Sequence, residues 1–354
     1  MSSAAAATID SHDPSLRVWT LGVADTARWD AFVMSCPEAT FFHRAGWKNV
    51  IENVFGHETY YLLAESSSGI EGVLPLGRVK SWLFGDALIS VPFGVYGGVA
   101  ALNENARILL EDEAERLAVS LGVDYLEMRH RTARRNWPVK NLYATFRKEI
   151  QSDPELNLKA IPRKQRAMVR KSMKAGLRAE VDSDIGRFFD AYATSVRNLG
   201  TPVYPRRYFQ ALLEEFGDDC EISVVMKDKR TVAGLMTFFF RDEVLPYYGG
   251  GPEVARSLRA NDFMYWELMN RAAARGARVF DYGRSKLGTG AYSFKKNWGF
   301  EPEPLEYQYR LVRASEVPNV SPANPKYRLM VEAWKRLPVS VSTILGPIIS
   351  RYIA

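Results

Sequence analysis

The sequence has little cysteine and histidine, and several common catalytic signatures are missing. Of its 354 residues, 2 are Cys and 4 are His. Cys36 and Cys220 have no CxxC partner and no other ligand at metal-binding spacing, which argues against a zinc site or a disulfide framework and indicates a reducing compartment. No GxxxxGKS/T, GxGxxG or HExxH pattern occurs, so the usual nucleotide hydrolases, dehydrogenases and zinc proteases are excluded.

The N-terminal segment also lacks the features of a secretion signal. It has neither a basic start nor an apolar core, so we expect a cytoplasmic protein. No local pattern of Cys and His builds a nucleophilic site. We therefore expect no covalent enzyme intermediate, no metal and no permanently bound cofactor.

Positive charge is concentrated in one stretch of the chain. The net charge is +6, yet residues 129–178 alone hold 15 Lys and Arg against 3 acidic residues. The rest of the chain is therefore acidic. A local excess of this kind attracts phosphate, nucleic acid or acidic lipid headgroups.

The chain repeats one pattern. Tyr96-Gly97-Gly98 and Tyr248-Gly249-Gly250 each end an expected strand, a helix follows, and Gly122 or Gly276 then leads into a strand with an acidic residue. This period is too long for a solenoid repeat and indicates a duplicated domain. Because 47% of the residues are hydrophobic, a chain of this length can bury two cores.

Strands alternate with helices in both halves, which predicts α/β domains with mixed sheets. We expect a first domain over residues 16–150 and a second over residues 151–315, with a linker at 130–160. A basic helix at 161–178 precedes the body of the second domain, and residues 316–354 form a helical tail. The order of elements resembles the acyltransferase fold of the GNAT superfamily. In that family two neighbouring strands diverge, the acyl donor pairs with one of them, and its pyrophosphate rests on the following helix.

The second Tyr-Gly-Gly is a candidate donor site. Glycines after Tyr248 let the backbone approach a ligand closely, and a helix at 262–275 with Asn261 as its N-cap offers free amides to a phosphate. The alternative is a glycine turn and an ordinary capped helix, and the repetition at Tyr96 favours a requirement of the fold. For Asp262, at the start of this helix, the alternatives are a base and a partner of the helix dipole. The candidate donor-binding residues are Gly249, Gly250, Gly251, Asn261 and Asp262, and Tyr248 is a candidate catalytic residue.

Charged residues bracket the end of the strand over residues 278–282. Acyl transfer to an amine needs a proton acceptor, and Asp281 at a strand end is a candidate base. Arg284 and Lys286 are candidates for clamping a phosphate or carboxylate of the substrate. The alternative is a structural ion pair between Asp281 and Arg284.

The run from Ala291 to Phe300 carries the most specific resemblance. It resembles the end of GNAT domains, and also the Phe-Lys-x-x-aromatic-Gly element of FemAB-type transferases. On the first pattern Lys295 replaces the tyrosine that protonates the leaving thiolate, and on the second it matches the lysine that reaches the reacting centre. The resemblance makes Lys295 a candidate oxyanion or acceptor ligand, with Tyr292 and Lys296 as candidate substrate contacts. The alternative is a surface lysine on an amphipathic helix.

Four further runs closely resemble the FemAB-like proteins associated with exosortase and PEP-CTERM systems. They begin at Ile161, Val196, Ala260 and Gly283. The best-known FemAB members carry two GNAT-like domains and transfer amino acids from aminoacyl-tRNA to peptidoglycan precursors. Several also have a long coiled-coil arm, and no heptad run of that length exists here. The resemblance thus implies acyl-CoA or aminoacyl-tRNA as co-substrate.

The basic helix and the tail are candidate contact surfaces. Arg166 and Arg170 belong to a cationic face that could bind a phosphate-bearing sugar or a lipid-linked precursor, and a solvated linker helix is the alternative. Residues 337–353 are too short and too interrupted by proline to span a bilayer. They lie either on a membrane surface or against the body of the protein.

Together these features predict a transferase of acyl or aminoacyl groups. Its acceptor would be an amine of an envelope or exopolysaccharide precursor, the first domain shaping the acceptor cleft and the second performing the transfer. The alternative from another class is a non-catalytic binding protein for a polyanion or nucleic acid.

Overall fold

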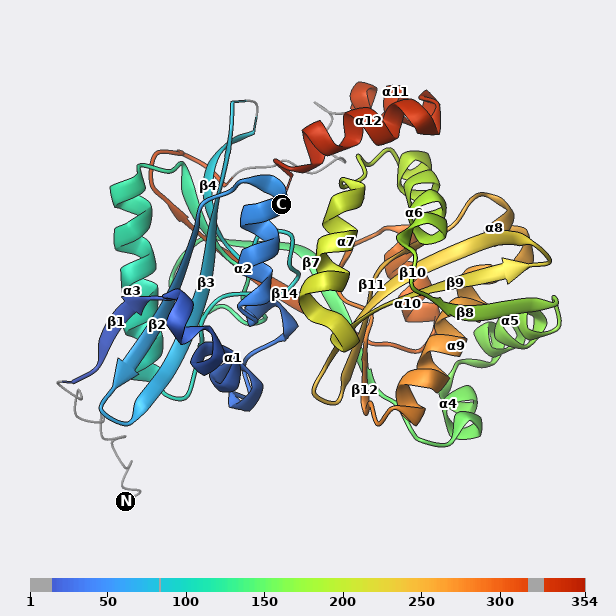
Figure 1. Cartoon of the computed structure of the whole chain (residues 1–354), viewed down its shortest axis with the longest axis horizontal. Helices are drawn as coiled ribbons and strands as arrows, with labels where there is room; N and C mark the ends of the chain where they lie inside the picture. The colour runs from blue at the N-terminus through green and yellow to red at the C-terminus, as the bar shows by residue number, and fades with distance from the viewer. Residues whose placement is uncertain (1–14, 83, 318–327, 354) are drawn as a thin grey trace, which may run out of the picture.

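The computed structural model describes residues 15–82, 84–317 and 328–353. Its centre is one mixed sheet, to which the described residues supply 14 strands (Figure 1). The main path runs β1 (Arg17–Thr20), β2 (Thr59–Ser66), β3 (Gly69–Ser81), β4 (Gly85–Ser90), β6 (Tyr125–Met128), β14 (Pro302–Leu311), β7 (Val139–Glu149), β12 (Val279–Asp281), β11 (Glu243–Gly250), β10 (Arg230–Phe240), β9 (Cys220–Lys227) and β8 (Leu177–Asp182). β5 (Ala100–Ala101) pairs with β3, and β13 (Ser285–Lys286) pairs with β7.

Both halves of the sheet follow the same plan. β2, β3 and β4 are antiparallel neighbours and β4 pairs in parallel with β6. Likewise β9, β10 and β11 are antiparallel and β11 pairs in parallel with β12. One long helix crosses over between the parallel strands of each half, α3 (Glu104–Leu121) in the first and α9 (Ala260–Ala274) in the second. The predicted α/β class with a duplicated mixed sheet is confirmed.

The halves are joined by strands rather than by a linker. β14, near the end of the second half, lies between β6 and β7, and β7 also pairs with β12. The predicted linker at residues 130–160 is therefore wrong, because this stretch contains β7 and α4 (Pro154–Ala160). Only Ala144, Thr145 and Phe146 of β7 are buried, so the surrounding charged residues hide the strand in the sequence. The predicted boundary near residue 150 falls directly after a strand of the continuous sheet.

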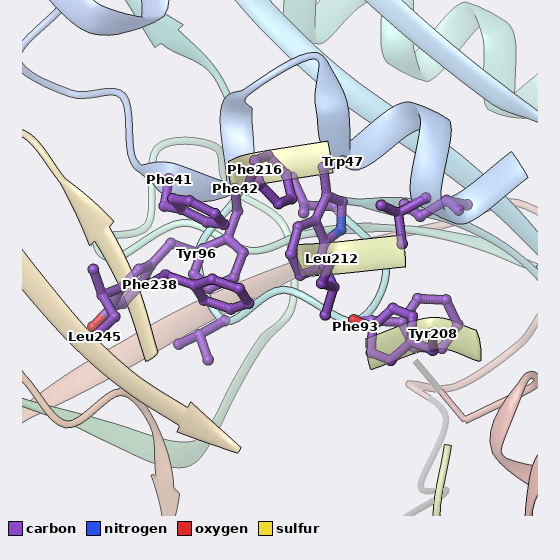
Figure 2. Packing of buried hydrophobic residues seen from close by; sticks show 14 of the residues in the cluster. Phe41, Phe42, Trp47, Phe93, Tyr96, Tyr208, Leu212, Phe216, Phe238 and Leu245 are labelled. Carbon is purple, nitrogen blue, oxygen red and sulfur yellow. The ribbon is translucent and has the colours of Figure 1, made fainter. Parts of the chain in front are cut away.

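Helices cover both faces of the sheet, and one face holds a core common to the two halves. α1 (Thr26–Ser35) and α2 (Gly46–Val50) pack beside α6 (Ile185–Leu199) and α7 (Arg206–Phe216) in this core. Figure 2 shows its centre, where the Phe41 ring stacks on Phe238 at 4.4 Å between centroids and Trp47 contacts Phe216. Truncating such a buried aromatic residue typically costs about 3–5 kcal/mol. The common core therefore fixes the first half against the second.

The remaining helices lie at the periphery. They are α5 (Arg163–Met173), α8 (Val254–Leu258), α10 (Gly290–Asn297), α11 (Arg328–Arg336) and α12 (Val339–Ser350). α5 packs against α9, whereas α11 and α12 pack against α6. The predicted tail thus contains two helices in its described part, and residues 318–327 lie outside the described residues. None of the helices formed by the described residues combines the length and the apolar character needed to cross a membrane.

Candidate active site

A cavity of about 390 Å³ lies where two parallel strands diverge. β11 and β12 pair only through Glu243 with Val279 and Val244 with Phe280. Beyond these pairs β11 continues to Gly250, whereas the chain after β12 turns at Gly283, which has φ +64°. The cavity walls include residues from both diverging segments, namely Pro246, Tyr247, Tyr248, Gly249, Tyr282, Gly283, Arg284 and Ser285.

Lys295 reaches this cavity from the last turn of α10. Thr289 caps the start of that helix through its side-chain oxygen, which accepts from the Tyr292 amide. The Nζ atom of Lys295 donates to the carbonyl oxygens of Tyr282, Gly283 and Arg284 at 2.7, 3.0 and 3.1 Å. Three acceptors match the three N–H groups of an ammonium. Burial lowers the pKa of Lys295 to about 7, against the opposing effect of the Asp281 carboxylate.

Arg284 supplies a second cation to the same cavity. Its guanidinium lies 4.8 Å from the ring centroid of Tyr143 and donates to the Tyr307 hydroxyl at 3.3 Å. The ion pair between Arg284 and Asp281, expected as an alternative, does not form, because Asp281 pairs with Arg147 instead. Within the described part of the chain, neither Arg284 nor Lys295 has a carboxylate oxygen within 4.0 Å. Neither charge is therefore neutralised by a carboxylate, although the Lys295 ammonium is hydrogen-bonded to three carbonyl oxygens.

The other walls of the cavity are largely aromatic. Tyrosines that line it are Tyr192, Tyr204, Tyr247, Tyr248, Tyr265 and Tyr282. Three lining residues, Tyr282, Ser285 and Ser350, have buried hydroxyl oxygens with no hydrogen-bond partner among the described residues. Unpaired buried polar groups are rare in folded proteins. The cavity thus suits a ligand with an apolar body, several hydrogen-bonding groups and a negatively charged or polarised oxygen.

Asp281, the candidate base, does not line the cavity. Its side chain is fully buried and accepts hydrogen bonds from Tyr96 at 2.8 Å and from the Gly283 amide at 2.7 Å, besides its 3.0 Å ion pair with Arg147. Burial raises the pKa of Asp281, and Arg147 counteracts that effect. The carboxylate fixes the turn whose carbonyl groups hold Lys295. It acts on the cavity through this turn.

The Tyr-Gly-Gly-Gly run is only partly exposed to the cavity. Tyr248 lines it, but its hydroxyl pairs with that of Tyr208 at 2.9 Å within the aromatic core. Gly249 also lines the cavity. A Cβ at Gly250 would lie 2.3 Å from Ser195 Oγ, and one at Gly251 would lie 2.3 Å from the Val232 carbonyl oxygen. These last two glycines are required by the packing of neighbouring elements. For Gly250 this agrees with the repetition of the pattern, whereas the counterpart of Gly251 in the first copy is Val99.

The start of α9 differs from the prediction. Arg259 is the N-cap, with φ +56° and no side-chain cap hydrogen bond, so Asn261 lies inside the helix and the predicted cap is wrong. Asp262 is buried and accepts from Trp298 Nε1 at 3.3 Å and from Gln165. Burial raises the pKa of Asp262. Its role is to join α9 to α5 and to the end of α10.

The remaining predicted substrate contacts lie outside the cavity. Lys286 is on β13, and the ring of Tyr292 packs edge-on against Phe146 at 5.2 Å between centroids. Lys296 is exposed on α10. Arg166 and Arg170 line a separate groove on α5 with Arg163, Lys171 and Lys174. The structure thus brings Lys295, Arg284, Tyr248 and Gly249 together and leaves the other candidates elsewhere.

Several cavity residues were not identified as site residues from the sequence. Phe93 and Val95 come from the first half, Thr201 and Pro202 follow α6, and Ile353 comes from the tail. The run that begins at Val196 was part of the FemAB resemblance and contains Thr201 and Pro202, but it gave them no role. The contributions from the first half and the tail depend on the tertiary arrangement, for which the sequence carries no local signal.

A second cavity, of about 510 Å³, lies against the first half. It is lined by Tyr96 and Arg147, the two side chains that bind Asp281. Its arginines are paired with acids, as in Arg147 with Glu243 and Arg107 with Glu38. Because these charges are neutralised within the protein, the Lys295 cavity is the stronger candidate site.

Comparison with known families gives a match within the second half of the chain. Residues 163–296 match the model of the acetyltransferase (GNAT) domain. Lys295 lies at the end of the matched stretch. Comparison with curated protein sequences gives no match.

Solved structures extend the similarity to both halves. The crystal structure of FemX has 15% sequence identity and a TM-score of 0.66, and the match covers 89% of this chain and 100% of that one. A tandem GNAT protein from the clavulanic acid biosynthesis pathway has 12% identity and a TM-score of 0.51, covering 85% and 100%. The fold is thus a tandem GNAT fold, as expected from the duplicated pattern.

Proposed function

We propose that this protein is a cytoplasmic transferase of acyl or aminoacyl groups. The donor is a thioester such as acyl-CoA, or the ester of an aminoacyl-tRNA, and the acceptor is an amine of an envelope or exopolysaccharide precursor. The observation that carries the proposal is the pair of cations, Lys295 and Arg284, on the wall of a cavity between the diverging strands of a GNAT domain.

The donor binds along the diverging part of β11. Beyond Val244 this strand is paired with β10 but no longer with β12, so an amide-containing arm can extend the sheet there. Gly249 lets that arm approach the backbone. Tyr265, one turn into α9, lines the same cavity, so the arm leads towards the free amides at the start of this helix. A phosphate of the donor binds at those amides.

The reaction is attack of the acceptor nitrogen on the carbonyl carbon of the donor. A C–N bond forms, the C–S or C–O bond of the donor breaks, and the proton lost by the amine ends on the leaving sulfur or oxygen. The Lys295 ammonium exchanges one of its carbonyl partners for the developing oxyanion. Losing one such donor typically costs about 100- to 1000-fold in rate. Arg284 binds an anionic group of the acceptor.

Two measurements test this function. Mass spectrometry of small molecules retained by the purified protein identifies the donor, with CoA thioesters and aminoacyl-tRNA as the expected classes. Transfer to an amine acceptor is then compared between wild type, Lys295→Ala and Lys296→Ala, the last changing an exposed lysine on the same helix. We expect Lys295→Ala alone to lose about 100-fold or more in rate. Full activity in Lys295→Ala contradicts the site assignment.

The basic groove on α5 supports a second candidate, a binding protein for polyanions. Five basic residues line this groove of about 550 Å³, and Arg166 is held by the carbonyl oxygens of Lys159 and Ile161. Salt dependence distinguishes the two functions. A polyanion binder loses affinity steeply as salt increases and transfers no acyl group.

A further inference from the structure

The tail is held in a fixed position and forms part of the wall of the Lys295 cavity. Ser350 and Ile353 line that cavity. Gly346 packs against the Val203 backbone, where a Cβ would lie 2.8 Å from the carbonyl oxygen. His57 of the first half lies 2.7 Å from the Arg351 carbonyl oxygen through Nε2. Contacts with both halves thus determine which face of α12 points outwards.

That outward face is apolar, contrary to the usual pattern of a surface helix. The inner positions of α12 are Ser342, Gly346 and Ser350, which are buried. The outer positions include Ile344 and Ile348, with 70% and 61% of their surface exposed. Surface helices normally bury the large apolar residues and expose the polar ones. The inverted arrangement indicates an apolar partner outside the described chain.

Neighbouring elements extend the apolar surface. α11 exposes 80% of Leu329 and 54% of Met330, and Leu199 at the end of α6 is 62% exposed. Across the molecule, the hairpin between β3 and β4 carries Trp82, which is fully exposed. In Figure 1 this hairpin and the helices α11 and α12 project beyond the same edge of the molecule. Scattered apolar residues are ordinary, but a grouped apolar edge marks an interaction surface.

The charges around this edge are basic. Residues 328–351 contain four basic side chains, Arg328, Lys335, Arg336 and Arg351, and one acidic side chain, Glu332, which pairs with Lys335 at 2.7 Å. Arg351 donates to the Phe55 carbonyl oxygen, so Arg328 and Arg336 are the basic residues of this stretch that project from the edge. Exposed Lys80 stands next to the hairpin tip. Basic residues beside an apolar helix face attract anionic lipid headgroups, and Trp is favoured at membrane interfaces. A second copy of the chain suits the edge less well, because a two-fold interface would bring the basic residues close to their own counterparts.

We propose that this edge, formed by α11, α12 and the tip of the hairpin between β3 and β4, docks on the surface of an anionic lipid bilayer. Docking brings the tail, whose residues Ser350 and Ile353 line the Lys295 cavity, close to the headgroups. As a deepening of the proposed function, on which this part rests, the acceptor amine then belongs to a lipid-linked precursor. The docking itself requires no catalysis.

Vesicle flotation tests the proposal with the full-length protein. The vesicles consist of phosphatidylcholine alone or of phosphatidylcholine with phosphatidylglycerol. We expect binding to the anionic vesicles, a loss of about tenfold or more in affinity for the double variant Ile344→Gln with Ile348→Gln, and a smaller loss for Trp82→Gln. The matched control is Val119→Gln with Leu156→Gln, which changes exposed apolar residues on α3 and α4. Circular dichroism melting checks that each variant is folded.

Each outcome of this test is informative. No binding of wild type to anionic vesicles overturns the proposal, as does equal binding by wild type and the Ile344 and Ile348 variant. A wild-type dimer that this variant converts to a monomer, without vesicle binding, assigns the edge to self-association and also overturns it. Lys295→Ala should bind vesicles like wild type, so a failure of the catalytic proposal is distinguishable from a failure of docking.

Discussion

In the first half of the sheet β4 and β6 part after the pair Ile89 and Glu127, and Arg129 occupies the space between them. Its Nη1 atom donates to the Gly94 carbonyl oxygen at 2.7 Å and its Nε atom to Glu127 at 2.7 Å. In the second half β11 and β12 part in the same way, but Gly283 follows the strand and a cavity remains. The first gap is therefore filled by an arginine side chain, with the cavity of about 510 Å³ beside it at Tyr96 and Gly97, whereas the second gap is open.

The same comparison explains the acidic residues of the repeated pattern. Glu127 and Asp281 each lie five residues after the glycine that precedes their strand, Gly122 or Gly276. Both are buried and both bind an arginine, Glu127 with Arg129 and Asp281 with Arg147. An acidic residue that occurs at the equivalent position in both halves stabilises the shared fold. Lys295 and Arg284, which carry the proposed chemistry, belong to the open gap alone.

Replacing the arginine that fills the first gap is expected to have the largest effect on stability. Arg129→Met leaves the Glu127 carboxylate buried without its partner, which typically costs about 3–5 kcal/mol. Arg284→Met, the matched change in the second gap, leaves no carboxylate unpaired and should cost about 1 kcal/mol or less. Denaturant unfolding followed by circular dichroism measures both. Equal losses in the two variants would contradict the distinction between a filled and an open gap.

The sequence was sufficient to predict the repeated architecture. The strand and helix order, the Tyr-Gly-Gly runs and the run that contains Lys295 are local patterns, and each agrees with the tandem GNAT fold. The repetition itself already indicated that the acidic strands belong to the fold. The catalytic role and the structural role of Asp281 were both open, and its burial favours the structural role.

The long-range partners could not be predicted in the same way. Tyr96 binds Asp281 from 185 residues away, and β14 enters the sheet between two earlier strands. Such pairings depend on the common core of the two halves rather than on a nearby signal. The cap at Asn261 failed for a different reason, since Arg259 in a left-handed conformation starts the helix earlier.

The charge of Lys295 in the open gap is expected to depend on pH, unlike the charge of Arg129 in the filled gap. Burial lowers the pKa of Lys295 to about 7, and in the proposed reaction the ammonium form binds the oxyanion. Above that pKa the charged fraction of Lys295 falls by about tenfold per pH unit. The titration of Lys295 should therefore make kcat/KM decrease as the pH rises. Lys295→Arg keeps a permanent charge and should lose this decrease while retaining part of the activity.

The pH profile of kcat/KM for wild type and Lys295→Arg checks this expectation. Deprotonation of the acceptor amine contributes a rise in the same profile, and it should be identical in the two proteins. The opposite result is a wild-type kcat/KM that rises through pH 7 and a rise that is absent in Lys295→Arg. That result would identify the neutral lysine as the base.

The smallest expected effect concerns the glycine that keeps the second gap open. Gly283 has φ +64°, and a Cβ there would lie 3.8 Å from the nearest atom, Val95 Cγ2. Gly283→Ala therefore introduces backbone strain without a clash, and should cost about 1–2 kcal/mol in the free energy of unfolding. Gly290→Ala in α10, with no atom within 4 Å of its Cβ, is the control that should be neutral or stabilising. The Gly283 carbonyl oxygen accepts a hydrogen bond from Lys295. If the peptide group of residue 283 rotates to relieve the strain, this hydrogen bond is changed, and the pH profile of activity changes with it. Loss of stability with an unchanged pH profile would show that the turn holds its shape, and that Gly283 is needed for the backbone conformation alone.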